Sequence, residues 1–160
     1  MHYKGLKIIR GGLLVDFDFN LEFNQLESIL SKLPDKVEKK VANAAVSAGA
    51  RVIRKEAEQF APYNESRTTG VHLRDAIIVK RDKNKVASYT VGTQYRGKKA
   101  APHAHLLEFG TVKMSPQPFL RPAFDTKGDQ AKAKMLNSLA TGIHREAAKL
   151  AGRSTKRKKR

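Results

Sequence analysis

Two prolines, Pro34 and Pro62, bracket a segment in which apolar and small residues recur at helical spacing. The stripe consists of Val37, Val41, Ala45, Ala48, Val52 and Phe60, while most lysine and arginine residues fall elsewhere. This period predicts a long helix over residues 36–60. The run 42–50 is rich in small residues, which allows another backbone to approach this helix closely.

A second helix is predicted for residues 122–150. Its apolar stripe consists of Phe124, Ala131, Met135, Leu139, Ile143, Ala147 and Leu150. Pro122 suits the first turn of a helix, where a missing N–H leaves no hydrogen bond unmade. At the start of the first helix, Asp35 followed by Glu38 matches a capping pattern.

Strands are indicated by shorter patterns. Apolar and acidic or amide residues alternate over residues 15–23, which is typical of a half-buried strand. Residues 77–81 and 86–92 read as two strands joined by a turn at 82–85. The segment 103–109 fits either a strand or a helical turn.

These elements predict an α+β fold. A mainly antiparallel sheet of three to four strands is packed by one long central helix and a C-terminal helix. The single domain is expected to span residues 13–152. A basic, flexible N-terminal segment at 1–12 precedes it, and a basic, disordered tail at 153–160 follows it.

The charge is extreme for 160 residues. Lys and Arg number 32 against 15 Asp and Glu, so the net charge of +17 predicts attraction to polyanions. Two groups are the candidate polyanion contacts: Arg96, Lys98 and Lys99 near Tyr95, and Lys156, Arg157, Lys158, Lys159 and Arg160 at the C-terminus. No apolar run approaches the ~20 residues of a membrane span, so no membrane partner is expected.

One constellation suggests catalysis: His103, His105 and Glu108. On a strand the two histidines share a face but Glu108 points away, whereas on a helix only His105 and Glu108 share a face. Cysteine is absent, and so is a glycine-rich phosphate loop. We therefore expect no catalytic, cofactor or metal site, and a structural role for Glu108, either capping the turn or pairing with Arg121.

The segment from His103 to Asp125 carries the most distinctive motif. It contains Glu108, Phe109, Gly110 and Thr111, then Gln117, Pro118, Phe119, Leu120, Arg121 and Pro122 before Ala123. This motif resembles that of the phage tail-completion, or neck, proteins, related to the minor tail protein Z group of long-tailed bacteriophages. Upstream, Ala61-Pro62, Thr69-Gly70 and the Leu73 to Ile77 block agree with the same family pattern.

The resemblance implies a structural, non-enzymatic virion protein. Such a protein forms a ring at the phage neck that joins the head–tail connector to the tail tube around the DNA channel. Its partners are other copies of itself in a cyclic homo-oligomer, the head-closure ring, the tail terminator or tail tube protein, and DNA through nonspecific contact. The motif residues, with the loops at 116–121 and 63–70, are then the candidate interface. Assembly takes place in the cytoplasm of the host bacterium.

Two other functions remain open on the residues alone. Charge alone supports a small nucleic-acid-binding protein without sequence preference. The histidine pair His103 and His105 supports a metal-dependent hydrolase, which needs further ligands from elsewhere in the chain. Salt-sensitive DNA binding distinguishes the first alternative, and metal-dependent activity distinguishes the second.

Overall fold

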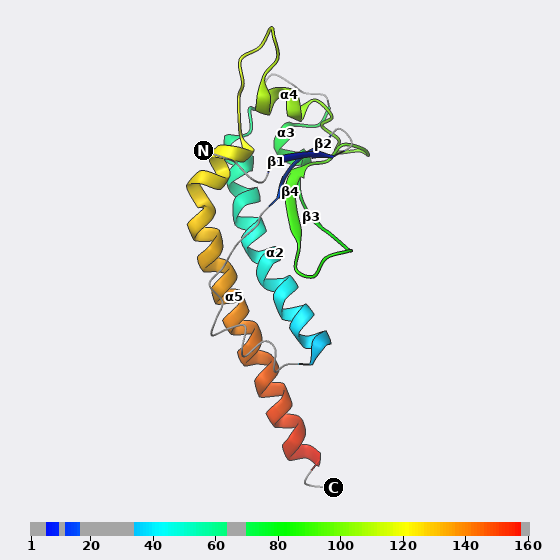
Figure 1. Ribbon diagram of the computed structural model, residues 1–160, viewed down its shortest axis with the longest axis vertical. Coiled ribbons are helices and arrows are strands. Elements are labelled where there is room, and N and C mark those ends of the chain that lie inside the picture. The colour runs from blue at the N-terminus through cyan, green and yellow to red at the C-terminus, as the bar shows by residue number, and fades with distance from the viewer. Residues whose placement is uncertain (1–5, 10–11, 17–33, 64–69, 158–160) are drawn as a thin grey trace.

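The computed structural model describes residues 6–9, 12–16, 34–63 and 70–157, with side chains for 34–63 and 70–149. Two long helices, α2 (Asp35–Phe60) and α5 (Leu120–Arg157), lie side by side and run in opposite directions (Figure 1). The sheet and two short helices, α3 (Leu73–Ala76) and α4 (Ala104–Phe109), lie beside the C-terminal half of α2. The α+β class, the long helix and the C-terminal helix are confirmed.

The sheet has the strand order β1-β2-β4-β3, and all neighbouring strands are antiparallel. Its strands are β1 (Leu6–Ile9), β2 (Gly12–Asp16), β3 (Ile77–Arg81) and β4 (Tyr89–Thr93). The described side chains of the sheet belong to the two strands of the β3–β4 hairpin. In this hairpin Ile77 and Val91 are fully buried, so these strands anchor the sheet to the helices.

The β3–β4 connection is longer than the sequence predicts. β3 occupies residues 77–81 as expected, but β4 begins at Tyr89 and not at residue 86. Ala87 has a φ of 51°, in the left-handed region, which interrupts an extended backbone. The N–H of Asn84 donates to the Asp82 carboxylate at 2.9 Å, so the chain turns there before pairing resumes.

At the N-terminus, β1 lies within the segment at 1–12 that was predicted to be flexible. Ile9 pairs with Gly12, and Leu6 with Val15, so β1 and β2 form a hairpin. Val15 and Asp16 are the first two positions of the strand predicted for residues 15–23, and the other positions lie outside the described residues.

One buried cluster joins every described layer of the fold. It contains residues of α2 and its C-cap, of α3, β3, β4 and α4, and of the start of α5: Ala50, Ile53, Ala57, Ala61, Leu73, Ile77, Val91, Ala104, Phe119, Leu120, Ala123 and Ala131. A separate cluster, Val41, Ala45, Leu139 and Ile143, is formed by α2 and α5 alone. The N-terminal half of α2 is therefore stabilised by α5, whereas its C-terminal half also packs against the sheet.

Small residues let the two long helices approach closely, as the run 42–50 predicts. A Cβ added at Gly49 would lie 2.3 Å from Cγ of Met135 and 3.1 Å from the carbonyl oxygen of Ala131. On α5, a Cβ added at Gly142 would lie 2.7 Å from Cγ1 of Val41. These contacts fix the register of the helix pair, because larger side chains do not fit at either crossing.

Both long helices differ from expectation at one end. Pro34, not Asp35, is the N-cap of α2, and no side chain caps this end, so the predicted Asp35–Glu38 capping is wrong. Asp35 lies inside the first turn instead, where a carboxylate still interacts favourably with the helix dipole. At the other end, α5 continues through Gly152 to Arg157, so the predicted tail boundary at 153 is wrong. An interior glycine costs only ~1 kcal/mol relative to alanine, which does not suffice to end a helix.

No helix in the described part of the chain combines the length and apolar character that a membrane span requires.

Two glycines of α5 allow a matched test of this close packing. Gly128 has no atom within 4 Å of an added Cβ, so Gly128→Ala should stabilise the protein by about 0.5–1 kcal/mol through helix propensity alone. Gly142→Ala should destabilise it, because the clash with Val41 costs ~1–3 kcal/mol and exceeds that gain. Chemical denaturation measures both changes, and Val41→Ala should recover part of the Gly142→Ala loss. Equal stabilisation by both alanines would contradict the helix register.

Candidate functional site

The carboxylate of Glu108 lies at the buried junction between α4 and α5. Its Oε2 accepts hydrogen bonds from the backbone N–H groups of Phe119 at 2.8 Å and Leu120 at 3.1 Å. Its Oε1 accepts one from the backbone N–H of Arg121 at 3.1 Å. The first N–H groups of a helix have no partner within the helix and carry partial positive charge, so they stabilise a buried carboxylate. Glu108 is therefore a tertiary cap of α5.

This geometry confirms the capping role predicted for Glu108. The carboxylate caps the turn at the start of α5, and the hydrogen bond from Arg121 to its Oε1 comes from the backbone N–H. Pro122 follows within the first turn of the helix, as the sequence predicts. Because Pro122 has no N–H, the three N–H groups before it are the ones that the carboxylate satisfies.

Gly110 turns the chain out of α4 into the loop that leads to α5. Its φ is 75°, in the left-handed region that favours glycine. An added Cβ would lie 2.8 Å from the carbonyl oxygen of Met114 and 2.9 Å from Cδ of Pro116, so any other residue would distort the loop. The glycine of the motif is thus required both by its backbone angle and by space.

The loop from Thr111 to Pro118, which we call the motif loop, projects beyond the helices and the sheet (Figure 1). Thr111 and Met114 form an antiparallel bridge with N–H to carbonyl distances of 2.8 and 3.2 Å. The N–H of Gln117 donates to the carbonyl of Leu107 at 2.7 Å. At the tip, the side chain of Val112 is completely exposed. The loop is therefore held at its base and across its turn while its tip contacts solvent.

The structure divides the predicted interface residues into two groups. Phe119 and Leu120 are completely buried in the main core, so their assignment to an interface is wrong. Their side chains point into the core because their backbone N–H groups face Glu108. Exposed members of the motif are Phe109, Thr111, Gln117, Pro118 and Arg121, whereas Gly110 and Pro122 are partly buried.

The histidines near the motif make local contacts. Nδ1 of His105 lies 2.9 Å from the carbonyl oxygen of Pro102, and both oxygens of Glu108 contact backbone N–H groups. His103 is exposed and precedes the first residue of α4. Within the described ranges, no group of three or more His, Cys, Asp or Glu residues is arranged to hold a metal ion.

The two predicted basic groups lie far apart in the fold. Arg96, Lys98 and Lys99 are exposed on the loop between β4 and α4, at the end of the molecule that carries α3 and α4 (Figure 1). Arg157 ends α5 at the opposite end, one residue after Lys156. Lys158, Lys159 and Arg160 lie outside the described residues. The structure therefore does not combine these groups into one basic surface.

A hollow that the sequence did not predict opens beside the first basic group. It has a volume of about 310 Å³ and is lined by Arg54, Glu58, Gln59, Arg74, Asp75 and Lys99. The guanidinium of Arg74 lies 4.1 Å from the ring centroid of Tyr63, which lies 4.5 Å from that of His72. Charges of both signs line the hollow, and Arg54 and Glu58 form an ion pair at 2.7 Å, so it presents no field of one sign.

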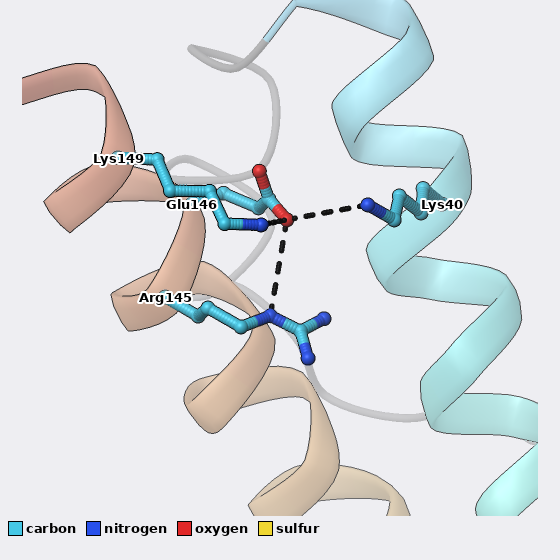
Figure 2. Close-up of polar contacts among 4 residues, drawn as sticks. All are labelled: Lys40, Arg145, Glu146 and Lys149. Atoms are coloured by element: carbon cyan, nitrogen blue, oxygen red, sulfur yellow. Dashed lines mark hydrogen bonds and ion pairs between the residues drawn. The ribbon is translucent and has the colours of Figure 1, made fainter. Parts of the chain in front are cut away.

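A second unpredicted cluster joins the long helices near the C-terminal end of α5. Figure 2 shows Lys40 of α2 on one side of the Glu146 carboxylate, and Arg145 and Lys149 of α5 on the other. Their nitrogens lie 3.5, 3.8 and 3.0 Å from Oε1 of Glu146. The spacing of Glu146 and Lys149, three residues apart on one helix, is the only signal of this cluster in the sequence. The contact with Lys40 depends on the register of the two helices, which the sequence pattern does not give.

These cations affect the ionisation of Glu146. The hydrogen bond from Lys149 lowers the pKa of Glu146 below its ordinary value, and the charges of Lys149 and Lys40 lower this pKa further. Burial of the carboxylate acts in the opposite direction and raises the pKa. The carboxylate therefore favours the folded state in its ionised form.

A comparison with protein-family models finds a match to this chain. The family is described as "Bacteriophage HK97-gp10, putative tail-component", and its model matches residues 24–110, more than half of the chain. The matched range contains α2, the β3–β4 hairpin and α4 through Gly110. It ends before the Gln117–Ala123 block and α5. No curated protein and no solved structure matches the chain.

The capping role of Glu108 predicts a loss of stability in Glu108→Gln. The amide keeps one acceptor oxygen but places a donor group against the N-terminus of α5, so we expect a loss of about 1.5–3 kcal/mol in the free energy of unfolding. Asp129→Asn removes the same charge from a side chain that is 99% exposed and should change stability by less than ~0.5 kcal/mol. Chemical denaturation measures both variants, and equal stabilities would show that the carboxylate does not hold α5.

Glu146 predicts a pH-dependent stability. A carboxylate whose pKa is lower in the folded state stabilises the protein above its unfolded pKa, and this contribution disappears as the pH falls through the folded pKa. The melting temperature of Glu146→Gln should therefore lie below that of the wild type at neutral pH. The difference should shrink on acidification below the ordinary value of 4.5. A difference that stays constant into acid would mean that the ion pairs do not contribute.

Proposed function

Because the chain belongs to the HK97-gp10-like family of bacteriophage tail components, we propose that it is a structural protein of the virion neck. In this role it forms a ring around the DNA channel and joins the head–tail connector to the tail tube. It meets the head-closure ring on one side and the tail terminator or tail tube protein on the other. Assembly takes place in the cytoplasm of the host bacterium, and no membrane takes part.

The motif loop is the observation that carries this proposal beyond family membership. Exposed loops on a rigid support commonly carry binding residues, because the scaffold fixes their position. Here the support is buried: Glu108 holds the start of α5, and Gly110 fixes the exit from α4. The exposed tip at Val112 is then available to a neighbouring subunit or ring without a change in the fold.

A ring also requires that each subunit present two different surfaces. Contacts in a cyclic oligomer larger than a dimer are heterologous, so one patch meets a chemically different patch on the next copy. The motif loop supplies one candidate surface. Candidates for the second surface are Phe60, Tyr63 and Tyr95, which are among the exposed large apolar and aromatic side chains of the described residues.

The proposed role includes no catalysis. Glu108, the acidic residue of the motif, contacts three backbone N–H groups, which leaves it poorly placed to act as a general acid or base. His105 contacts the carbonyl of Pro102 at the other end of the same short helix. Both side chains have local structural roles that account for their presence.

The test is complementation of a phage that carries this gene, after the gene has been removed. Val112→Asp should give folded protein but leave filled heads and free tails unjoined, because a charge at the loop tip opposes burial against a partner. Electron microscopy of lysates and the titre of infectious particles measure this outcome. Val86→Asp, at another exposed valine on the β3–β4 connection, should restore joining as well as the wild type does.

Two results would contradict the proposal. Normal joining by Val112→Asp would exclude the motif loop as the contact. Lysates that lack the protein but contain complete, infectious particles would exclude the neck role itself.

A further inference from the structure

We propose that the far end of the helix pair binds the sugar-phosphate backbone of duplex DNA without sequence preference. This surface, the basic end, is formed by Lys36, Lys39 and Lys40 of α2 with Arg145 and Lys149 of α5. All five side chains are exposed, and they lie at the end of the molecule opposite the motif loop (Figure 1). The inference does not depend on the neck role.

The basic end keeps a positive charge after its ion pairs are formed. One carboxylate, Glu146, contacts three cations through a single oxygen, so pairing cannot neutralise them. Lys40, Arg145 and Lys149 also leave 63%, 56% and 52% of their side-chain surface exposed. Among the residues that the structure describes, the other carboxylates at this end are Asp35 and Glu38, both in the first turn of α2. The cations still outnumber the carboxylates there, which attracts a polyanion.

The two helices place these cations in rows. Lys36 and Lys40 are four residues apart on α2, and Arg145 and Lys149 are four apart on α5, so each pair shares one face of its helix. On α5, Arg153 follows Lys149 after four residues, and Lys156 follows after three more. From position 145 to position 156 the helix extends over roughly 16 Å, a length that matches several successive phosphates of one strand.

The register of the helices leaves the last turns of α5 beyond the start of α2. Gly49 crosses α5 at Ala131 and Met135, Val41 meets Gly142, and Lys40 meets Glu146. Because the helices are antiparallel, α2 begins near position 150 of α5, and the remaining turns to Arg157 extend past it (Figure 1). A duplex can therefore approach the last turns of α5 without contacting α2 along its whole length.

The chemistry of the surface favours phosphate over an acidic protein. Protein interfaces have an apolar centre and are depleted in lysine, whereas phosphate contacts are made chiefly by lysine and arginine. Among the described side chains, the exposed large hydrophobic residues lie elsewhere; Leu136, the one closest along α5, is more than two turns before Arg145. The basic end thus supplies charge without an apolar anchor.

The experiment measures binding of the full-length protein to two labelled duplexes of unrelated sequence over a range of salt concentrations. The site variant is Arg145→Gln with Lys149→Gln, and the matched control is Lys80→Gln with Arg81→Gln, two exposed residues of β3. Both variants remove the same charge. The site variant should reduce the slope of log affinity against log salt by up to ~1.8, at about 0.9 per phosphate contact, while the control should keep the wild-type slope.

Two further variants keep the proposal testable if the loss of Glu146 partners weakens the fold. Lys36→Gln with Lys39→Gln alters cations outside the Glu146 cluster and should also reduce the slope. Glu146→Gln removes a negative charge from the basic end and should strengthen DNA binding in every preparation that circular dichroism finds folded.

Three results would overturn the inference. Equal losses in the site variant and the β3 control would assign binding to the overall charge of the protein. A strong preference for one duplex would exclude a backbone contact. Competition by polyglutamate that matches DNA at equal charge would assign the surface to an acidic protein partner.

Discussion

The contact between the Glu108 carboxylate and the start of α5 determines much of the remaining structure. It joins residues that are 11 to 13 positions apart, and thereby closes the motif loop at its base. The same contact turns the side chains of Phe119 and Leu120 into the core, where they meet α2 and the sheet. This contact fixes the start of α5, and the close approaches at Gly49 and Gly142 fix its register against α2 along the rest of its length.

The two ends of the helix pair have different chemistry as a result. At one end, α4 and the motif loop present a supported backbone with an exposed apolar tip. At the other, Lys40, Arg145 and Lys149 surround Glu146, and the last turns of α5 extend beyond α2. The proposed contacts with neighbouring proteins and with DNA therefore use surfaces that do not compete for the same residues, which suits a component that holds proteins together around a nucleic acid.

Sequence patterns predicted correctly those elements whose formation depends on neighbouring residues. The long helix and β3 were predicted within one residue of their observed bounds, because helical spacing between two prolines and a short apolar run are properties of neighbouring residues. The start of β4 was missed because Ala87 adopts a left-handed conformation that alanine seldom favours. Phe119 was assigned to an interface because a proline-bracketed apolar pair looks the same in sequence whether it faces solvent or the core.

The sequence by itself determined the α+β class, the two long helices, the β3–β4 hairpin and the family membership, which rests on the match over residues 24–110. Only the tertiary structure decided what the motif does, because the partners of Glu108 are backbone N–H groups, which every residue except proline possesses and which no pattern of side chains identifies. It also decided that Lys40 meets Glu146, since that pairing depends on the helix register set by Gly49 and Gly142. Contacts between distant segments depend on packing, and packing is fixed only when the whole core forms.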